Sequence, residues 1–284
     1  MSAYWRDRLE RQKNLLLGKS IDETNSHLAT IYKSSIRDIE KDMKALLFDI
    51  KKEDGVKIND LYRDNRFWEM RSDINKRLTT LGQKQIEVMD KDLTDMYMRV
   101  QQYFNENPKF LAHTITNGRA ERVRELSMTP VDLHDPIVSL KANEAVHSLW
   151  CADGLYWNDR VWNNMALLQD RLEAGITDII VRGTNPDELI VQLAKEQGQQ
   201  AFTRSERLVR TELSHIYNYA AAERYAEAGC NGYEWLTARD ERVCEECEEL
   251  DGRFFPFGNE SELPPVHPNC LCTIIPVIGG DRRG

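Results

Sequence analysis

Apolar residues recur at helical spacing through most of the first half of the chain. They follow one another at intervals of three or four over residues 28–50, and the pattern resumes over residues 67–81 and 86–104. Such intervals place side chains on one face of a helix, where they pack against a partner. The predicted inward positions are Leu28, Tyr32, Ile36, Ile39, Met43, Leu46, Ile50, Phe67, Met70, Ile74, Leu78, Leu81, Ile86, Met89, Leu93, Tyr97, Val100 and Phe104. The pattern predicts long helices, interrupted at Asp54-Gly55 and ended by Asn107-Pro108, because proline cannot continue a helix.

The second half begins after a stretch rich in turn residues. Residues 127–136 contain two prolines, which predicts a domain boundary between a long-helix region, 1–128, and a second domain, 137–284. Helical spacing returns over residues 161–179. Asn185-Pro186 then predicts a helix start, with Asn185 as the N-cap and Pro186 at the first helical position. A further helix is predicted from about Arg204 to Ala228, where Gly229 ends it.

The periodicity changes after Gly229. Residues 233–237, 253–255 and 273–275 are short runs of aromatic or β-branched residues separated by turns, so they predict the strands of a small sheet. The predicted fold class is therefore mainly α, with long N-terminal helices, a helical core, and a small α+β subdomain at residues 230–278 that carries a short β-sheet.

Composition and charge narrow the class of protein. The chain has 284 residues, of which 41% are hydrophobic, with a formal net charge of -9. Residues 1–150 carry 25 basic and 24 acidic side chains, and residues 151–284 carry 13 and 23, so the second part holds the negative charge. This balance argues against duplex DNA as the main partner. The charged N-terminus and the lack of a long apolar run predict a protein made and kept in the cytoplasm, without a membrane partner.

Four of the six cysteines lie close together near the C-terminus. Cys244 and Cys247 form a C-x2-C pair, and His267, Cys270 and Cys272 follow after a loop of 19 residues. Two such closely spaced groups can close a tetrahedron of thiolate and imidazole ligands around zinc. We expect a structural zinc ion that holds together a sheet too small to be stable alone.

The sequence does not decide which four of these five residues bind the metal. Cys244, Cys247, His267 and Cys270 are favoured, because His267-x2-Cys270 repeats the spacing of the first pair, and Cys272 either replaces Cys270 or stays beside the site. A disulfide or redox role and plain buried cysteines are the competing interpretations. Cys151 and Cys230 are expected to be ordinary buried or half-buried thiols.

The sequence predicts a protein without catalytic activity and without catalytic residues. A catalytic zinc ion keeps an open coordination position, whereas four or five candidate ligands describe a closed site. The chain also contains no HExxH, P-loop, GxSxG or dinucleotide-binding motif. The alternative is a zinc-dependent hydrolase, nuclease-like or toxin-like, that uses Glu212, Asp240 or His267.

A second alternative is a DNA-binding module. Arg204, Arg207 and Arg210 lie three residues apart, so they would share one face of a helix and could contact phosphates. A solvated helix face that pairs with Glu206 and Glu212 is the competing interpretation.

From about Trp157 onward the chain resembles the minor head proteins of tailed bacteriophages, the head-morphogenesis family that includes proteins like protein F of phage Mu. The resemblance covers roughly the last 45% of the chain. It lies in an ordered series of motifs: Gly183-Thr184-Asn185-Pro186, Arg210-Thr211-Glu212, Ala228-Gly229, Trp235-Leu236-Thr237, Asp240-Glu241-Arg242-Val243-Cys244-Glu245-Glu246-Cys247, Leu250-Asp251-Gly252 and Pro264-Pro265-Val266-His267-Pro268-Asn269-Cys270-Leu271-Cys272. Leu271 departs from the family, which often has arginine between the two cysteines.

This resemblance implies a minor capsid protein that acts in head morphogenesis. Its partners would be the portal protein and, in addition, the major capsid or scaffold protein, with weak contact to packaged DNA. Its place would be the interior of the virion near the portal vertex. The apolar seams of the long helices could pack against another subunit's helices.

Overall fold

The computed structural model describes residues 11–52, 65–116, 119–151, 153–182, 186–238, 243–258 and 263–279. The chain divides into two compact units that alternate along the sequence. The helical unit comprises residues 25–89 and 157–206, and the sheet-containing unit comprises residues 1–24, 90–156 and 207–284. The sequence boundary proposed near residues 128–137 is not tested by this division and stays a prediction.

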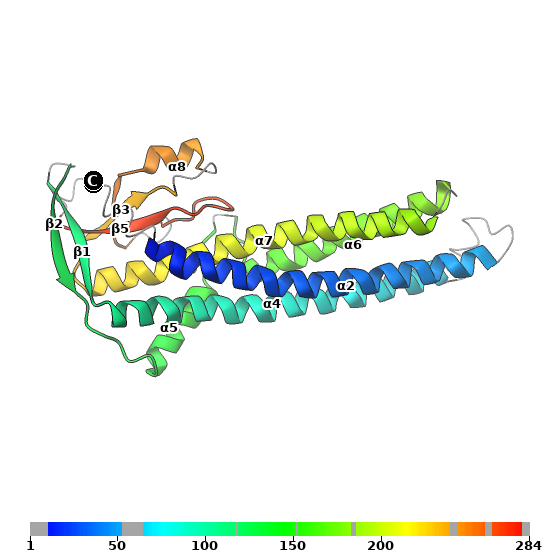
Figure 1. The fold of residues 1–284 in the computed structure, drawn as a ribbon, viewed down its shortest axis with the longest axis horizontal. Coiled ribbons are helices and arrows are strands. Elements are labelled where there is room, and N and C mark those ends of the chain that lie inside the picture. Colours follow the sequence, from blue (N-terminus) through cyan, green and yellow to red (C-terminus); the bar gives the residue numbers. More distant parts are fainter. Residues whose placement is uncertain are drawn as a thin grey trace. The chain divides into compact units, whose positions relative to one another are not determined.

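Long helices dominate the described chain, as the apolar spacing predicts (Figure 1). A π-helical turn, η1 (Asn14–Gly18), leads into α2 (Lys19–Lys52), and α4 (Arg66–Glu106) follows. Next along the chain are α5 (Pro136–Val146), α6 (Trp157–Arg182) and α7 (Pro186–Glu227). The short α8 (Glu245–Leu250) lies close to the C-terminus. Within the described residues, no helix has the length and apolar content needed to cross a membrane.

The core of the helical unit consists of the predicted stripes packed against one another, with Ile190 and Ala201 of α7 as members that were not predicted. Its buried side chains are Tyr32, Ile39, Met43, Leu46, Phe67, Met70, Ile74, Leu78, Leu81, Met165, Leu168, Leu172, Ile176, Ile179, Ile190 and Ala201. Close packing is visible at Gly82 of α4, where an added Cβ atom would lie 2.6 Å from the ring of Trp162. Such a contact is too short for any residue larger than glycine unless the indole moves.

One element differs from the prediction for this part of the chain. The start at Pro186 and the segment from Arg204 to Ala228 belong to one continuous helix, α7, rather than to two. Gly198 falls between them inside the helix, and the side chain of Ile36 lies so close that an added Cβ atom would be 2.7 Å from it. The predicted N-cap, Asn185, lies outside the described residues, as does the predicted break at Asp54-Gly55.

The sheet-containing unit holds a five-stranded sheet in the order β2-β1-β5-β3-β4. The three strands expected from the sequence are present as β3 (Gly232–Leu236), β4 (Phe254–Pro256) and β5 (Thr273–Ile278). The hairpin of β1 (Lys109–Thr116) and β2 (Arg119–Ser127) was not predicted. It extends the sheet through parallel pairing of β1 with β5, in which His113 lies opposite Val277. All other strand pairs are antiparallel.

The sheet packs on aromatic and aliphatic side chains of this unit. Trp235 and Tyr233 of β3 and Val277 of β5 are almost completely buried. The rings of Phe104 from α4 and Tyr225 from α7 meet edge to face, with their centroids 5.4 Å apart. Every residue of β3 is buried, which is typical of a strand covered on both faces. The central strands β3 and β5 therefore give the loops at their ends a rigid base.

Candidate metal centre

The first ligand pair is positioned by the start of α8. Cys244 is the N-cap of this helix, and its Sγ atom accepts a hydrogen bond from the backbone N–H of Cys247 at 3.4 Å. A side chain that accepts from the third helical residue is the usual capping geometry. The helix start thus turns both sulfur atoms to the same side. Cys247 is fully buried and Cys244 is half-buried.

His267 completes the first group of donors. Its Nε2 atom lies 3.2 Å from the Sγ atom of Cys244 and 3.2 Å from that of Cys247. Its Nδ1 atom lies 3.0 Å from the carbonyl oxygen of Pro268. A carbonyl only accepts, so Nδ1 carries the proton and Nε2 presents its lone pair to the two sulfur atoms. This arrangement is how proteins orient a metal-binding imidazole.

Cys270 and Cys272 lie on the other side of Cys247. The Sγ atoms of Cys247 and Cys270 are 3.8 Å apart. Cys247, Cys270 and Cys272 form a second group whose ligand atoms all lie within 4.8 Å of one another, and Cys244, Cys247 and His267 form the first. The five residues singled out in the sequence are therefore brought together around Cys247, and their soft donors can hold a metal ion.

The thiols influence one another's protonation. The hydrogen bond between Cys270 and Cys272 lowers the pKa of Cys272 to about 6 and raises the pKa of Cys270. Burial raises the pKa of the Cys247 thiol. Because a cysteine binds metal as the thiolate, a bound cation has to displace these protons, and its affinity decreases in acid.

The ligand loop is tied to α7 by side chains that the sequence analysis did not single out. The backbone N–H of Asn269 donates to the hydroxyl of Thr211 at 2.8 Å, and Asn218 donates to the carbonyl of Cys272 at 3.1 Å. The hydroxyl of Thr273 donates to the side-chain amide oxygen of Asn218 at 2.9 Å. Thr211 and Asn218 are seven residues apart on one helix face, a polar spacing that could have been noticed among the apolar inward positions.

The N-terminal segment adds a further contact to this loop. The ammonium group of Lys13 donates to the carbonyl oxygen of Leu271 at 2.8 Å, and Lys13 is buried despite its charge. Leu271 stands between the last two cysteines. The carbonyl that faces Lys13 therefore belongs to the segment that carries the metal donors.

Glu212 and His215, two other polar residues of α7, are buried. Glu212 accepts a hydrogen bond from the indole of Trp150 at 3.0 Å, and the ring of His215 stacks on that indole with centroids 4.4 Å apart. Burial lowers the pKa of His215 to about 3. Among the described residues, neither side chain belongs to a group able to hold a metal ion. Asp240, the other candidate base, lies outside the described residues.

The three arginines proposed as nucleic-acid contacts differ in exposure. Arg207 is exposed, whereas Arg204 and Arg210 are half-buried. The guanidinium of Arg204 donates to Asn164 at 2.6 Å. Their role in binding DNA stays a prediction.

The comparisons with known proteins concern the part of the chain that holds the metal centre. Residues 170–275 match the model of the family of phage Mu protein F like proteins. An uncharacterized protein of Methanocaldococcus jannaschii is 27% identical over 123 residues, which is 43% of this chain and 20% of that protein. The chain thus spans about a fifth of the length of this curated relative. No solved structure matches the chain. All five candidate ligands fall within the range that matches this family model.

Proposed function

We propose that the chain is a structural minor capsid protein of a tailed bacteriophage that acts in head morphogenesis. The observation that carries the proposal is the family match over residues 170–275. This range includes all of α7 and the complete cysteine and histidine cluster.

The proposed site of action is the interior of the virion near the portal vertex. The portal protein is the proposed main partner, and the major capsid or scaffold protein the second. This placement is supported by the resemblance of the motifs between Gly183 and Cys272 to minor head proteins, which are made together with portal and scaffold.

We further propose that the metal is zinc and that its role is structural. Two thiolates of a tetrahedral zinc site, with Zn–S bonds of about 2.3 Å, lie about 3.8 Å apart. The Cys247–Cys270 separation of 3.8 Å agrees with this value. Cys244, Cys247, His267 and Cys270 would hold the ion, and Cys272 would lie beside it. Bound zinc would join the start of α8 to the loop before β5, and four protein ligands would leave no position for a substrate or a reactive water.

Native mass spectrometry tests both parts of this proposal. The chain is co-expressed with the portal protein of its own phage and purified without chelator, with a portal protein from an unrelated phage as the control. The expected result is a complex with the cognate portal only, with one zinc ion per copy of the chain. Zinc without portal binding would contradict the head-assembly role, and a metal-free chain bound to portal would contradict the structural zinc.

A further inference from the structure

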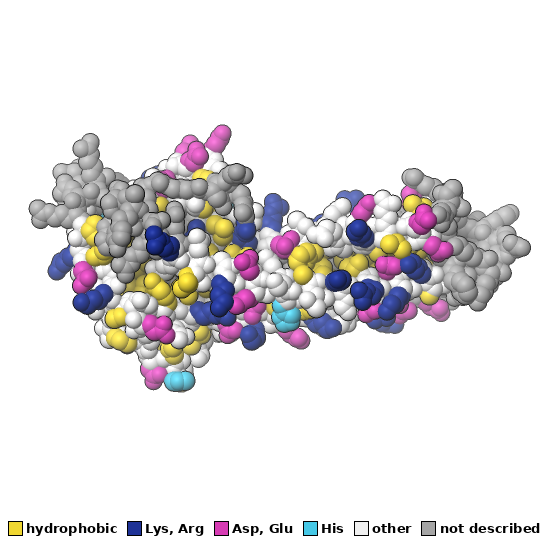
Figure 2. Space-filling view, in the orientation of Figure 1, with side chains coloured by type: hydrophobic (Ala, Val, Ile, Leu, Met, Phe, Trp, Pro, Cys, Tyr) yellow, Lys and Arg dark blue, Asp and Glu magenta, His cyan; other side chains and the backbone are white. Residues whose placement is uncertain are grey.

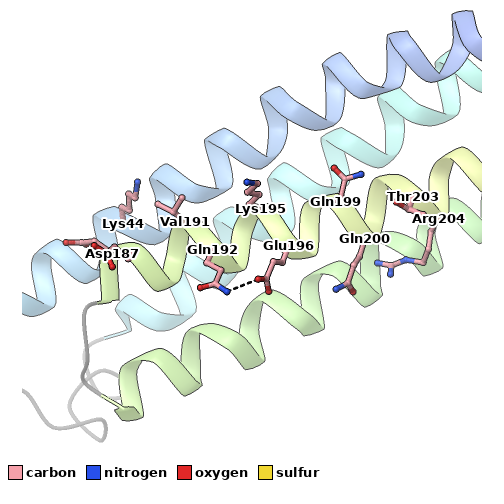
Figure 3. A pocket seen from close by; sticks show the side chains of 11 residues that line it. Lys44, Asp187, Val191, Gln192, Lys195, Glu196, Gln199, Gln200, Thr203 and Arg204 are labelled. Atoms are coloured by element: carbon pink, nitrogen blue, oxygen red, sulfur yellow. Dashed lines mark hydrogen bonds between the residues drawn. The ribbon is translucent and has the colours of Figure 1, made fainter.

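Two surfaces of the described chain are candidates for binding a partner. The first is a groove of 1040 Å³ along the first half of α7 in the helical unit (Figure 3). Among the described residues that line it, Val191 is the only large apolar one, and the others are charged or polar, such as Lys195 and Gln199. Water solvates such side chains well, so this groove gains little free energy from being covered.

The second surface is the outer face of α5, which is apolar although it faces solvent. Ile137 and Leu140 are 60% and 56% exposed and lie three residues apart, on one side of the helix. We call these two residues the α5 stripe. Leu149, just after the helix, is 51% exposed, and Figure 2 shows hydrophobic side chains at the surface over α5. The inner face is also apolar, with Val138 and Ala142 buried. A helix that is apolar all round is normally covered on all sides, so the α5 stripe is suited to contact with another molecule.

α5 is held in place within the sheet-containing unit. Lys141 forms ion pairs with Glu223 at 3.1 Å and with Glu227 at 3.2 Å, both on α7. At the other end of the helix, the Nε2 atom of His147 lies 3.2 Å from a carboxylate oxygen of Asp90 on α4. These contacts fix the direction in which the α5 stripe points. A partner therefore loses little of its binding free energy to the ordering of this helix.

The charges around α5 determine which kind of partner fits. Asp132 is exposed in the turn before the helix, and Glu144 is exposed one turn after Leu140. Lys141 is the only basic residue of α5, and two glutamates of α7 hold it. The α5 stripe thus has an acidic border. Self-association would place two acidic surfaces against each other, and anionic lipids or nucleic acid would be repelled. The surface fits a second protein whose apolar groove is bordered by lysine or arginine.

We propose that α5 docks into an apolar groove with a basic border on the portal protein, with the side chains of Ile137 and Leu140 inside the groove. This inference rests on the proposed role in the phage head, which supplies the portal protein as the partner. A helix that places residues three apart in a hydrophobic groove is a common mode of protein recognition. Burial of the α5 stripe removes apolar surface from water, which provides affinity, and Glu144 favours a basic border over an acidic one.

The experiment measures the affinity of the full chain for the portal protein of its own phage. Leu140→Glu should weaken portal binding about thirtyfold, because it places a charge in an apolar contact. Leu140→Met keeps the apolar surface and should bind as the wild type does. Because Leu140 is exposed, neither substitution should disturb the fold, and hydrogen exchange together with the zinc content checks this point.

Leu167→Glu is the matched control for the apolar contact, because Leu167 is a 38% exposed leucine of α6 in the helical unit. It should bind portal as the wild type does. Glu144→Lys tests the charge and should weaken binding about fivefold at low salt, with a smaller effect at high salt. Glu87→Lys makes the same change at an exposed position of α4 and should leave binding unchanged.

The outcomes separate this inference from the proposed function. If the wild type binds portal and Leu140→Glu binds equally well, the docking of α5 is overturned and the role in the phage head stands. Equal weakening by Leu140→Glu and Leu167→Glu would also overturn it, because the effect would not belong to α5. If the wild type does not bind portal, the proposed function fails, and the docking of α5 on portal fails with it.

Discussion

The backbone N–H of Asn269 donates a hydrogen bond of 2.8 Å to the hydroxyl of Thr211, which joins the loop between His267 and Cys270 to α7. Asn269 adopts a left-handed backbone conformation, with φ of 72°, and His267 and Cys270 on either side of this turn both approach the Sγ atom of Cys247. The hydroxyl of Thr211 also donates to the carbonyl of Arg207 at 2.7 Å. One buried threonine thus connects the helix to the metal-binding loop.

Thr211→Val is therefore expected to destabilise the sheet-containing unit. Valine keeps the shape of threonine but removes the acceptor, which leaves the N–H of Asn269 without a partner at a cost of about 1–3 kcal/mol. Thr211→Ser keeps the hydroxyl and should remain close to the wild type. Chemical denaturation of both variants, with zinc present, measures the difference. Equal loss of stability in the two variants would show that the methyl group matters rather than the hydrogen bond.

Substitution of Cys244 or Cys247 is predicted to unfold part of the sheet-containing unit and to leave the helical unit folded. Cys244→Ser and Cys247→Ser should abolish zinc binding and unfold the C-terminal subdomain, because the short β4 strand and α8 bury little apolar surface of their own. The helices of the helical unit should keep their protection in hydrogen exchange. Cys151→Ser is the control and should retain zinc. A single cooperative melt that neither substitution nor chelator changes would contradict the structural role of the metal.

The choice between Cys270 and Cys272 is a separate prediction. Cys270→Ser should lose zinc. The Sγ atoms of Cys270 and Cys247 are 3.8 Å apart, which is the separation of two thiolates bound to the same zinc ion. Cys272→Ser should keep one zinc ion per chain with weaker affinity, since Cys272 lies beside the ligands and its hydrogen bond with Cys270 affects the protonation of both. Competition with a chromogenic chelator gives both affinities. The reverse order would assign Cys272 as the fourth ligand.

His215 makes the stability of the sheet-containing unit depend on pH. Burial lowers its pKa to about 3 in the folded chain, whereas the unfolded value is about 6.5. Between these values the unfolded state binds more protons, so stability is fully present above about pH 6.5 and is lost as the pH falls. The slope is about 1.4 kcal/mol per pH unit. His215→Phe keeps the stacking on Trp150 and removes this contribution. Denaturation curves at several pH values should show that the free energy of unfolding decreases less in acid for the variant than for the wild type. The same decrease in both proteins would contradict the role of His215.

The helical unit could be predicted well from the sequence because its core follows the spacing of apolar residues. Tyr32, Ile39, Met43, Phe67, Ile74 and Leu168 are buried in this core. Ile86 shows the limit of the method: it is half-buried, and the neighbouring Gln85 is fully buried instead. The hydroxyl of Tyr32 donates to Gln85 at 2.7 Å, and such a pairing cannot be recognised from apolar spacing.

The sheet was predicted in part. The three C-terminal strands are short β-branched or aromatic runs, and their positions were confirmed. The hairpin of β1 and β2 was missed, although Asn117-Gly118 stands between two runs that alternate in polarity and is a strong hairpin signal. The grouping of five cysteine and histidine donors was predicted by spacing. The support from Thr211 and Lys13 was not, because it depends on how distant segments pack.

The buried polar group around Asn164 gives a last prediction. Its amide nitrogen donates to the carbonyl of Ala201 at 2.9 Å and to the hydroxyl of Tyr32 at 3.2 Å, and its oxygen accepts from Arg204. Asn164→Leu would leave these buried groups without partners, and we expect a loss of about 3 kcal/mol in the free energy of unfolding. Asn163→Leu, at the exposed neighbouring position, should change stability by less than about 0.5 kcal/mol. Thermal and urea unfolding of the two variants give the comparison. A leucine at position 164 that leaves the helical unit as stable as the wild type would mean that the apolar stripes alone hold its helices in register.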